Sequence, residues 1–336
     1  MTPALAEAAI RGFQETVTAV RREVGKAVVG HEQAIDVILC AFFAGGHVLI
    51  EGVPGIGKTL IVRSLGEALA LAFNRIQFTV DLMPADITGT RIVNDAADGR
   101  REFHFVPGPI FTHILLADEI NRATPKTQSA LLEAMAEQQV TIAGTTYPIA
   151  SPFFVLATLN PIEMEGTYQL PEAQLDRFLF KVQLEYPSQA ELERILDTTT
   201  AATLPAVSPV LERATAPARV DELRRLVREV LVAPHVERYV AALVRSTIPG
   251  SGMSEDAVGR YVSYGSSPRG GQALILGAKV MALLDGRPHV AVEDVDRIAP
   301  AALAHRLVLN FAAEAAGVGP TEVVARVLTA ARHLRA

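Results

Sequence analysis

Apolar residues recur along this chain with two different spacings. In the first part, a stripe repeated every three or four positions indicates one buried face of an α-helix over residues 4–24. The stripe consists of Ile10, Phe13, Val17, Val20 and Val24. A coiled-coil seam would show the same stripe, but packing on the chain's own core is the preferred interpretation. Elsewhere, short and almost wholly apolar runs are typical of buried parallel strands.

Strand and helix patterns alternate up to Tyr186-Pro187, and the remaining pattern is helical. The expected strands are 47–50, 75–80, 113–118, 152–160 and 179–184, with β-hairpins at 88–108 (turn at Asp98-Gly99) and 139–149 (turn at Ala143-Gly144). The expected helices are 4–24, 32–44, 58–71, one starting at 124–127, and 220–232, 235–247, 254–263, 268–285, 293–308 and 320–334. Ser188 to Glu191 is a capping box that opens a further helix. Residues 198–219 are expected to be an extended connection. The pattern predicts an α/β domain over 1–186 and a helical domain over 187–336.

Composition narrows the function classes. The 336 residues are 49% hydrophobic and carry a net charge of −6, which disfavours a dedicated nucleic-acid surface. A local basic groove of Arg91, Arg100 and Arg101 stays possible. The single Cys40 is expected to be a core thiol, and the eight histidines show no zinc-ligand spacing. Neither a signal peptide nor a membrane span is expected, so we expect a cytoplasmic protein.

The stretch from Gly52 to Thr59, Gly-Val-Pro-Gly-Ile-Gly-Lys-Thr, is the strongest chemical signal. It lies between an apolar strand and a helical run, as a phosphate-binding loop requires. Its glycines let backbone N–H groups approach an anion, and the helix N-terminus adds a favourable dipole. Lys58 is expected to reach the β- and γ-phosphates, and the Thr59 hydroxyl is expected to bind Mg²⁺. The stretch therefore predicts nucleotide binding.

A second signal is the apolar run 113–117, which ends in Asp118 and Glu119. Ligands of α/β sheets bind at the carboxyl ends of parallel strands. Asp118 is expected to hold Mg²⁺, directly or through water, and Glu119 to orient and deprotonate an attacking water. A solvated acidic turn is the alternative, which the phosphate loop upstream disfavours. The strand expected between the two motifs favours hydrolysis over kinase-type transfer.

Three further polar residues are candidates. Asn160 ends a buried strand and can bind the attacking water or the γ-phosphate, while also starting a turn with Pro161. Arg177 is either a structural partner of Asp176, which the residues alone slightly favour, or a group directed at a neighbouring subunit's nucleotide. Arg269 opens a capped helix and is expected over the phosphates of its own chain, because a solvated cation there opposes the helix dipole.

Val28-Val29-Gly30 precedes the expected helix 32–44. This apolar segment lies upstream of the phosphate loop. It fits an adenine slot and a plain helix-to-helix turn equally well.

Taken together, these residues resemble the AAA+ ATPases, and within them the MoxR family. Residues 52–59 match the Walker A motif and 114–119 the Walker B motif, while 118–126, 170–178 and 267–269 resemble MoxR segments. By this resemblance Asn160 is sensor 1, Arg177 the arginine finger and Arg269 sensor 2. The two hairpins correspond to the helix-2 insert and the pre-sensor-1 hairpin, as in magnesium chelatase motor subunits. His31 stands where Gln is more usual.

The resemblance implies a five-stranded parallel sheet with an all-α lid, and a Mg²⁺-dependent ATPase that forms rings, usually hexamers. ATP would lie at subunit interfaces, with Arg177 acting in the neighbour's site. Thr59 and Asp118 would hold Mg²⁺, Asp118 through water. The residues implied to bind ATP are Val28, Val29, Gly52, Pro54, Gly55, Ile56, Gly57, Lys58, Thr59, Leu60 and Asp118.

The resemblance also implies a chaperone-like role in maturation, or in metal or cofactor insertion, of a separate partner protein, often one with a von Willebrand factor A domain. A metal-chelatase motor subunit and a nucleic-acid-stimulated motor are the alternatives. A non-enzymatic scaffold is disfavoured by Asp118, Glu119 and Asn160.

Overall fold

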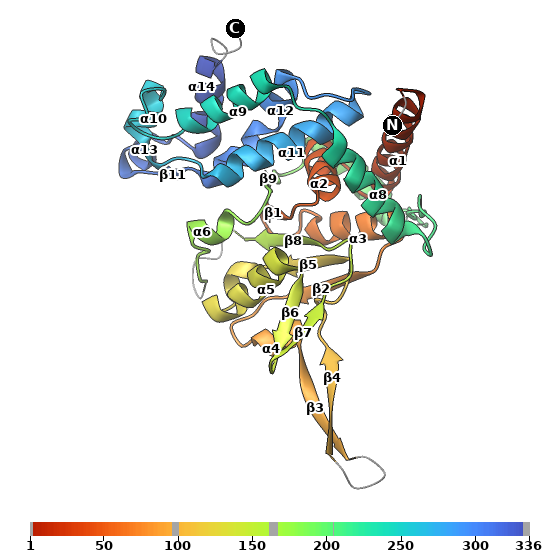
Figure 1. Cartoon of the computed structure of the whole chain (residues 1–336). Helices are drawn as coiled ribbons and strands as arrows, with labels where there is room; N and C mark the ends of the chain where they lie inside the picture. The colour runs from red at the N-terminus through yellow and green to blue at the C-terminus, as the bar shows by residue number, and fades with distance from the viewer. Residues whose placement is uncertain (1–2, 96–100, 161–166, 204, 332–336) are drawn as a thin grey trace.

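The computed structural model describes residues 3–95, 101–160, 167–203 and 205–331. The turn expected at Asp98-Gly99, the basic residue Arg100, the proline of the Asn160-Pro161 turn and the end of the last helix at 332–334 lie outside these residues. Figure 1 shows the sheet in the middle of the molecule, the C-terminal helices above it and a long β-hairpin projecting below it.

The central sheet has five parallel strands in the order β2-β5-β8-β1-β9. They are β1 (Val48–Glu51), β2 (Phe73–Gln77), β5 (Ile114–Asp118), β8 (Phe154–Leu159) and β9 (Phe180–Gln183). Every residue of β5 is buried, which explains its continuous apolar run. The expected five-stranded α/β fold is confirmed. Strand β2 lies earlier than the expected strand 75–80, although the Phe78 N–H still donates to the Asp118 carbonyl at 2.9 Å.

Helices and two antiparallel hairpins surround this sheet. They are α1 (Pro3–Ala27), α2 (Glu32–Ala44), α3 (Lys58–Ala68), α4 (Pro84–Thr88), α5 (Pro125–Glu137), α6 (Glu172–Leu175), a 3-10 turn (Ile120–Arg122), β3 (Gly89–Asp95) with β4 (Arg101–Pro107), and β6 (Gln139–Ile142) with β7 (Thr145–Pro148). Phe105 stacks on Tyr147 with ring centroids 4.0 Å apart, which joins the bases of the two hairpins. Arg91 lies over the Phe103 ring further out. Both expected hairpins are confirmed.

The C-terminal part is helical, with one small two-stranded sheet. It contains α7 (Gln189–Thr200), α8 (Ala216–Glu229), α9 (Pro234–Ser246), α10 (Asp256–Tyr261), β10 (Val262–Tyr264), α11 (Pro268–Leu284), α12 (Val292–Leu303), a 3-10 turn (Ala304–Arg306), β11 (Val308–Leu309), α13 (Phe311–Ala316) and α14 (Pro320–Ala331). The capping box is confirmed, because the Glu191 N–H donates to Ser188 Oγ and the Ser188 N–H donates to the Glu191 carboxylate.

Three expectations about this part were wrong. The helix expected over 254–263 ends at Tyr261, and the chain continues directly into β10. Helix α8 begins within the stretch 198–219 that was expected to be extended, because Pro217 takes the first helical turn, where its missing N–H is not needed. The expected helix 293–308 ends at Leu303, and the chain then turns and pairs β11 with β10.

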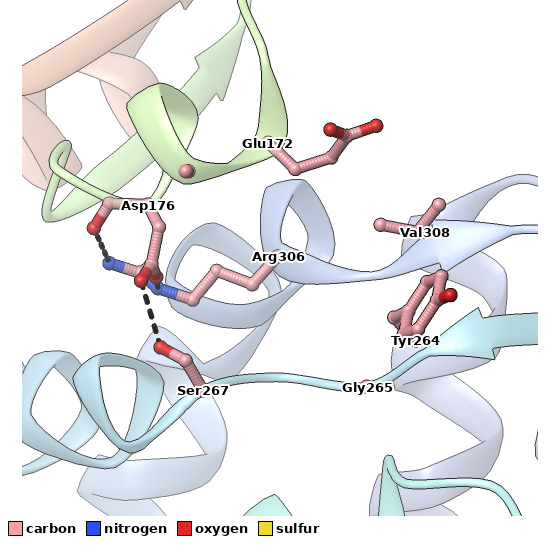
Figure 2. A pocket seen from close by; sticks show the side chains of 8 residues that line it. Glu172, Asp176, Tyr264, Gly265, Ser267, Arg306 and Val308 are labelled. Atoms are coloured by element: carbon pink, nitrogen blue, oxygen red, sulfur yellow. Dashed lines mark hydrogen bonds and ion pairs between the residues drawn. The ribbon is translucent and has the colours of Figure 1, made fainter.

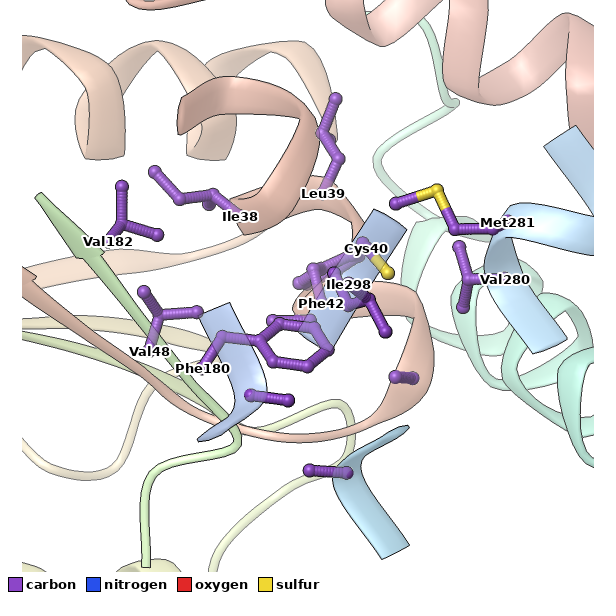
Figure 3. Packing of buried hydrophobic residues seen from close by; sticks show 14 of the residues in the cluster. Ile38, Leu39, Cys40, Phe42, Val48, Phe180, Val182, Val280, Met281 and Ile298 are labelled. Atoms are coloured by element: carbon purple, nitrogen blue, oxygen red, sulfur yellow. The ribbon is translucent and has the colours of Figure 1, made fainter. Parts of the chain in front are cut away.

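Helix α2 connects the sheet to the C-terminal helices through one hydrophobic core. Figure 3 shows part of this core, to which α2 contributes Phe42, β9 contributes Phe180 and α12 contributes Ile298. A Cβ on Gly277 of α11 would lie 2.7 Å from Phe180 and from Ile298, so the close approach of α11 requires glycine.

Cys40 is buried in this core, as expected, and burial raises the pKa of its thiol. No helix in the described part of the chain is long and apolar enough to cross a membrane.

Candidate nucleotide site

The phosphate loop runs from the end of β1 into α3. Gly55 and Gly57 have φ angles of 84° and 90°, in the left-handed region that favours glycine. A Cβ on Gly52 would lie 2.5 Å from Ile56 Cδ1. Pro54 is exposed, and helix α3 begins at Lys58, directly after Gly57. The loop therefore places the N-terminus of α3 at the carboxyl edge of the sheet.

Lys58 is buried under this loop. Its Nζ donates to the Gly52 carbonyl at 2.8 Å and to the Leu159 carbonyl at 3.4 Å. Burial lowers the pKa of Lys58, and the nearby Asp118 and Glu119 carboxylates partly offset that effect. An ammonium group binds charged phosphate oxygens more strongly than neutral carbonyl oxygens. Lys58 is therefore expected to move to the phosphates when a nucleotide binds. Thr59 and Leu60 follow in the first turn of α3; Thr59 is half-buried and Leu60 is 40% exposed.

Asp118 and Glu119 lie at the same edge, held by a hydroxyl that the sequence did not single out. Thr158 Oγ1 on β8 donates to Asp118 Oδ1 at 2.6 Å and accepts from the Glu119 N–H at 2.8 Å. Glu119 has a φ of 56°, a left-handed conformation uncommon for a residue other than glycine. Such strained positions cluster at functional sites.

Two side chains of β2 also reach these acids. Arg75 Nη2 lies 2.7 Å from Asp118 Oδ2, and Gln77 Nε2 donates to Glu119 Oε2 at 2.7 Å. Arg122 Nη1 also donates to Glu119 Oε2, at 3.1 Å. Alternation along β2 puts Arg75 and Gln77 on one face, and Gln77 is in register with Asp118. Both carboxylates are thus held by basic or amide groups in this structure.

The donors at this edge fit Mg²⁺ as it occurs with nucleotides. The ion prefers oxygen ligands, and it is usually held by one or two protein groups together with substrate phosphates. Thr59 and Asp118 supply a hydroxyl and a carboxylate. Among the residues that the structure describes, no group of three or more His, Cys, Asp or Glu could hold a metal alone. Thr59 and Asp118 would hold Mg²⁺ only together with a nucleotide.

Asn160 follows β8 at this edge and is 3% exposed. The Gly52 N–H donates to the Leu159 carbonyl at 3.3 Å, which places the end of β8 beside the phosphate loop. The structure therefore brings Asn160 together with Lys58 and Asp118, as the strand ends predicted.

A cavity of about 390 Å³ lies near the end of β9, the strand next to β1. Its lining includes Val29, Gly30, His31, Tyr186 and Glu191. Val28 is instead buried in the hydrophobic core. Val29 and Gly30 line this cavity and Val28 does not, so an adenine slot at this place would be formed by Val29 and Gly30.

Arg177 and Arg269 lie elsewhere. Both line a cavity of about 360 Å³ that includes Gly45 and Gly46, which precede β1. All five strands of the central sheet are parallel, so this is the amino-terminal edge of the sheet, and the chain from Gly46 to Gly52 spans about 20 Å. The expectation that Arg269 lies over the phosphates of its own chain does not match this position. The orientation of the helical part, which no local motif encodes, decides where Arg269 lies.

The side chain of Arg177 does not pair with Asp176. Its Nη1 donates to the carbonyl of Leu132, within α5, at 2.7 Å. Asp176 instead bonds Arg306 and Ser267, and Arg269 Nη1 lies 3.6 Å from its carboxylate. Arg177 and Asp176 therefore do not form the structural pair that was one of the two alternatives for Arg177.

The fold and the phosphate loop together define a P-loop ATPase of the AAA+ class with a helical lid. Residues 47–180 match the model of the ATPase family associated with various cellular activities (AAA), and residues 254–327 match the AAA lid domain. A crystal structure of a protein assigned as an ATPase from Cytophaga hutchinsonii matches with a TM-score of 0.86 and 39% identity, covering 97% of each chain.

Sequence relatives narrow the class. The chain is 44% identical to "Chaperone MoxR1" of Mycobacterium tuberculosis over 91% of this chain and 79% of the relative. It is 42% identical to the uncharacterized protein YeaC of Bacillus subtilis over 92% of both chains. It is 33% identical to "Protein MoxR" of Methylorubrum extorquens over 90% of this chain and 91% of the relative. The chain belongs to the MoxR family of AAA+ ATPases.

Proposed function

We propose that this protein hydrolyses ATP with Mg²⁺ and uses the cycle to remodel a partner protein in a chaperone-like way. The observation that carries the proposal is the gathering of Lys58, Asp118, Glu119 and Asn160 at one edge of the sheet, around the N-terminus of α3. These groups are a cation for phosphates, a carboxylate for metal, a base and an amide, which phosphoryl transfer to water requires.

Each residue has a defined role in this proposal. The α3 N-terminus and Lys58 bind the phosphates, and Lys58 leaves the Gly52 carbonyl to do so. Thr59 and Asp118 hold Mg²⁺, which neutralises phosphate charge when bound. Glu119 orients the attacking water and takes its proton, and Asn160 fixes that water or the γ-phosphate.

Glu119 is held in the structure by Gln77 and Arg122, with its carboxylate oxygen accepting from both. A general base must be within hydrogen-bond reach of the proton it takes. Both bonds are made to Oε2, so neither occupies Oε1, and Oε1 can take the proton of the attacking water.

We propose that the complete site is divided between neighbouring subunits of a homo-oligomeric ring, with six subunits as the family resemblance suggests. Arg177 and Arg269 line a cavity at the edge opposite their own phosphate loop. Arginines there can neutralise γ-phosphate charge only in another subunit, and such groups are worth roughly 10³–10⁵ in rate. The trans placement of Arg269 replaces the expectation that it acts within its own chain.

The cellular role rests on relatives. One relative is named a chaperone, and maturation or metal or cofactor insertion of a separate partner protein, by this protein in the cytoplasm, is the role we propose here. A partner with a von Willebrand factor A domain fits the family. A metal-chelatase motor would use the same ATP site.

The test is Glu119→Gln, with the exposed Glu133→Gln on α5 as the matched control. The Glu119 variant should bind ATP as the wild type does and lose hydrolysis, because the amide cannot take a proton. The Glu133 variant should hydrolyse normally. Unchanged turnover in Glu119→Gln would remove the role given to Glu119.

A further inference from the structure

One buried cation of the lid has no part in the ATP site described above. Arg306 ends the turn after α12, and only 3% of its side chain is exposed. Its Nε donates to Asp176 Oδ1 at 2.8 Å, its Nη2 to the Phe178 carbonyl at 2.7 Å, and its Nη1 to the Leu179 carbonyl at 3.1 Å. Nη1 also contacts the Ala302 carbonyl. A planar guanidinium can bind several acceptors in one fixed geometry, and here most of them belong to one segment, 176–179.

The same segment is attached to the start of α11. Ser267 Oγ donates to Asp176 Oδ2 at 2.9 Å, and Arg269 Nη1 lies 3.6 Å from that oxygen. Figure 2 shows Arg306 and Ser267 bonded to Asp176 from different elements of the lid. Asp176 is thus a single carboxylate between two parts of the lid.

A buried ion pair is weak evidence for stability, because desolvation offsets much of the attraction. The effect of this ion pair on the positions of neighbouring groups is clearer than its effect on stability. Arg177 lies between Asp176 and Phe178, and the backbone carbonyls of both accept hydrogen bonds from Arg306. Arg269 approaches the same carboxylate that Arg306 binds. The guanidinium of Arg306 therefore fixes the backbone that carries Arg177 and the carboxylate beside Arg269.

We propose that Arg306 is a positioning residue that holds Arg177 and Arg269 as one unit, so that the lid and both arginines move together relative to a neighbouring subunit's nucleotide. This inference rests on the proposed divided site. It predicts that loss of the Arg306 fork impairs hydrolysis in the neighbour's site and leaves ATP binding to the variant's own phosphate loop intact.

The first test is Arg306→Lys, which keeps the charge but loses the fork. Small misplacement of a group acting on the transition state lowers turnover far more than ground-state binding, so kcat should fall by about 10- to 100-fold. KM for ATP should stay within about twofold, as expected when only transition-state contacts are lost. Asp176→Asn is the second variant, in case Arg306→Lys does not fold. It should give the same result, a lower kcat with a nearly unchanged KM for ATP. The exposed Arg326→Lys on α14 is the matched control and should match the wild type in both constants.

The second test assigns the defect to a subunit. Arg306→Lys subunits are mixed with Lys58→Ala subunits, and Arg177→Ala subunits are mixed with Lys58→Ala subunits as the reference. Recovery of ATPase activity in both mixtures supports the inference, because some interfaces then combine an intact phosphate loop with a correctly held arginine pair. A structural defect confined to the variant's own site gives no such recovery.

The remaining outcomes overturn the inference in distinguishable ways. Recovery in the Arg177 mixture without recovery in the Arg306 mixture keeps the divided site and removes the role of Arg306. Recovery in neither mixture contradicts the divided site, and the role of Arg306 falls with it. Wild-type kcat in Arg306→Lys contradicts the inference directly.

Discussion

His47, which directly precedes β1, is buried and held neutral. The Val155 N–H donates to its Nδ1 at 3.0 Å, so the ring proton lies on Nε2, which donates to the Met135 carbonyl at 3.2 Å. Burial is the main cause that lowers the pKa of His47 to about 4. We therefore expect acid to destabilise the protein partly through this residue.

The sign and size follow from linkage. The pKa of His47 is lower in the folded protein than in the unfolded chain, so the unfolded chain binds more protons between those two values. The contribution of His47 to the free energy of unfolding is fully present above about pH 6.5 and is lost as the pH falls towards about 4. From about pH 7.5 to about pH 5, protonation of His47 in the unfolded chain should remove about 2 kcal/mol from the free energy of unfolding.

The perturbation is His47→Gln, whose amide can accept from Val155 and donate to Met135 but does not titrate. Urea unfolding of wild type and variant at a series of pH values gives the difference in free energy of unfolding. That difference should shrink by about 2 kcal/mol over this range, and other buried histidines cancel because both proteins carry them. The exposed His235→Gln is the control and should give a constant difference. A difference for His47→Gln that does not change with pH would refute the reasoning.

Three further predictions concern the ATP site and the core. Arg75→Ala should lower the Mn²⁺ concentration that half-saturates the nucleotide-bound protein by several-fold, measured by electron paramagnetic resonance, because a cation 2.7 Å from Asp118 competes with the metal; unchanged affinity would count against that competition. Thr158→Val should keep ATP binding but lower kcat by about 10-fold or more, since both Walker B acids lose its hydroxyl; wild-type kcat would contradict this. Gly277→Ala should lower the free energy of unfolding by about 1–3 kcal/mol through overpacking against Phe180 and Ile298, and urea unfolding without such a loss would contradict the close packing of α11.

Features encoded locally in the sequence could be predicted. The phosphate loop is a continuous motif, and the acids of β5 end an apolar run, so their meeting at one sheet edge follows from parallel strands. The capped start of α11 was also predictable, and the Arg269 N–H donates to Ser267 Oγ at 3.1 Å.

Contacts between elements distant in the sequence could not be predicted. Arg75 and Gln77 meet the Walker B acids only because β2 pairs with β5 in one particular register. Thr158 reaches both acids because β8 lies on the other side of β5. Arg269 lies at the opposite edge from the phosphate loop because α11 packs against α2 in a shared core. Strand order and lid orientation are set by tertiary packing, which a motif does not contain.

The central claim is that the ATP site is completed by a neighbouring subunit. It is tested most directly by the ATPase rate of Lys58→Ala and Arg177→Ala proteins mixed at varying ratios, each being nearly inactive alone. At equal amounts, about a quarter of the interfaces in randomly assembled rings should carry an intact phosphate loop facing an intact Arg177. The account predicts an activity maximum near that ratio, approaching a quarter of the wild-type rate. Activity that stays at the level of the separate variants at every ratio, in mixtures shown by sedimentation to form mixed oligomers, would contradict it.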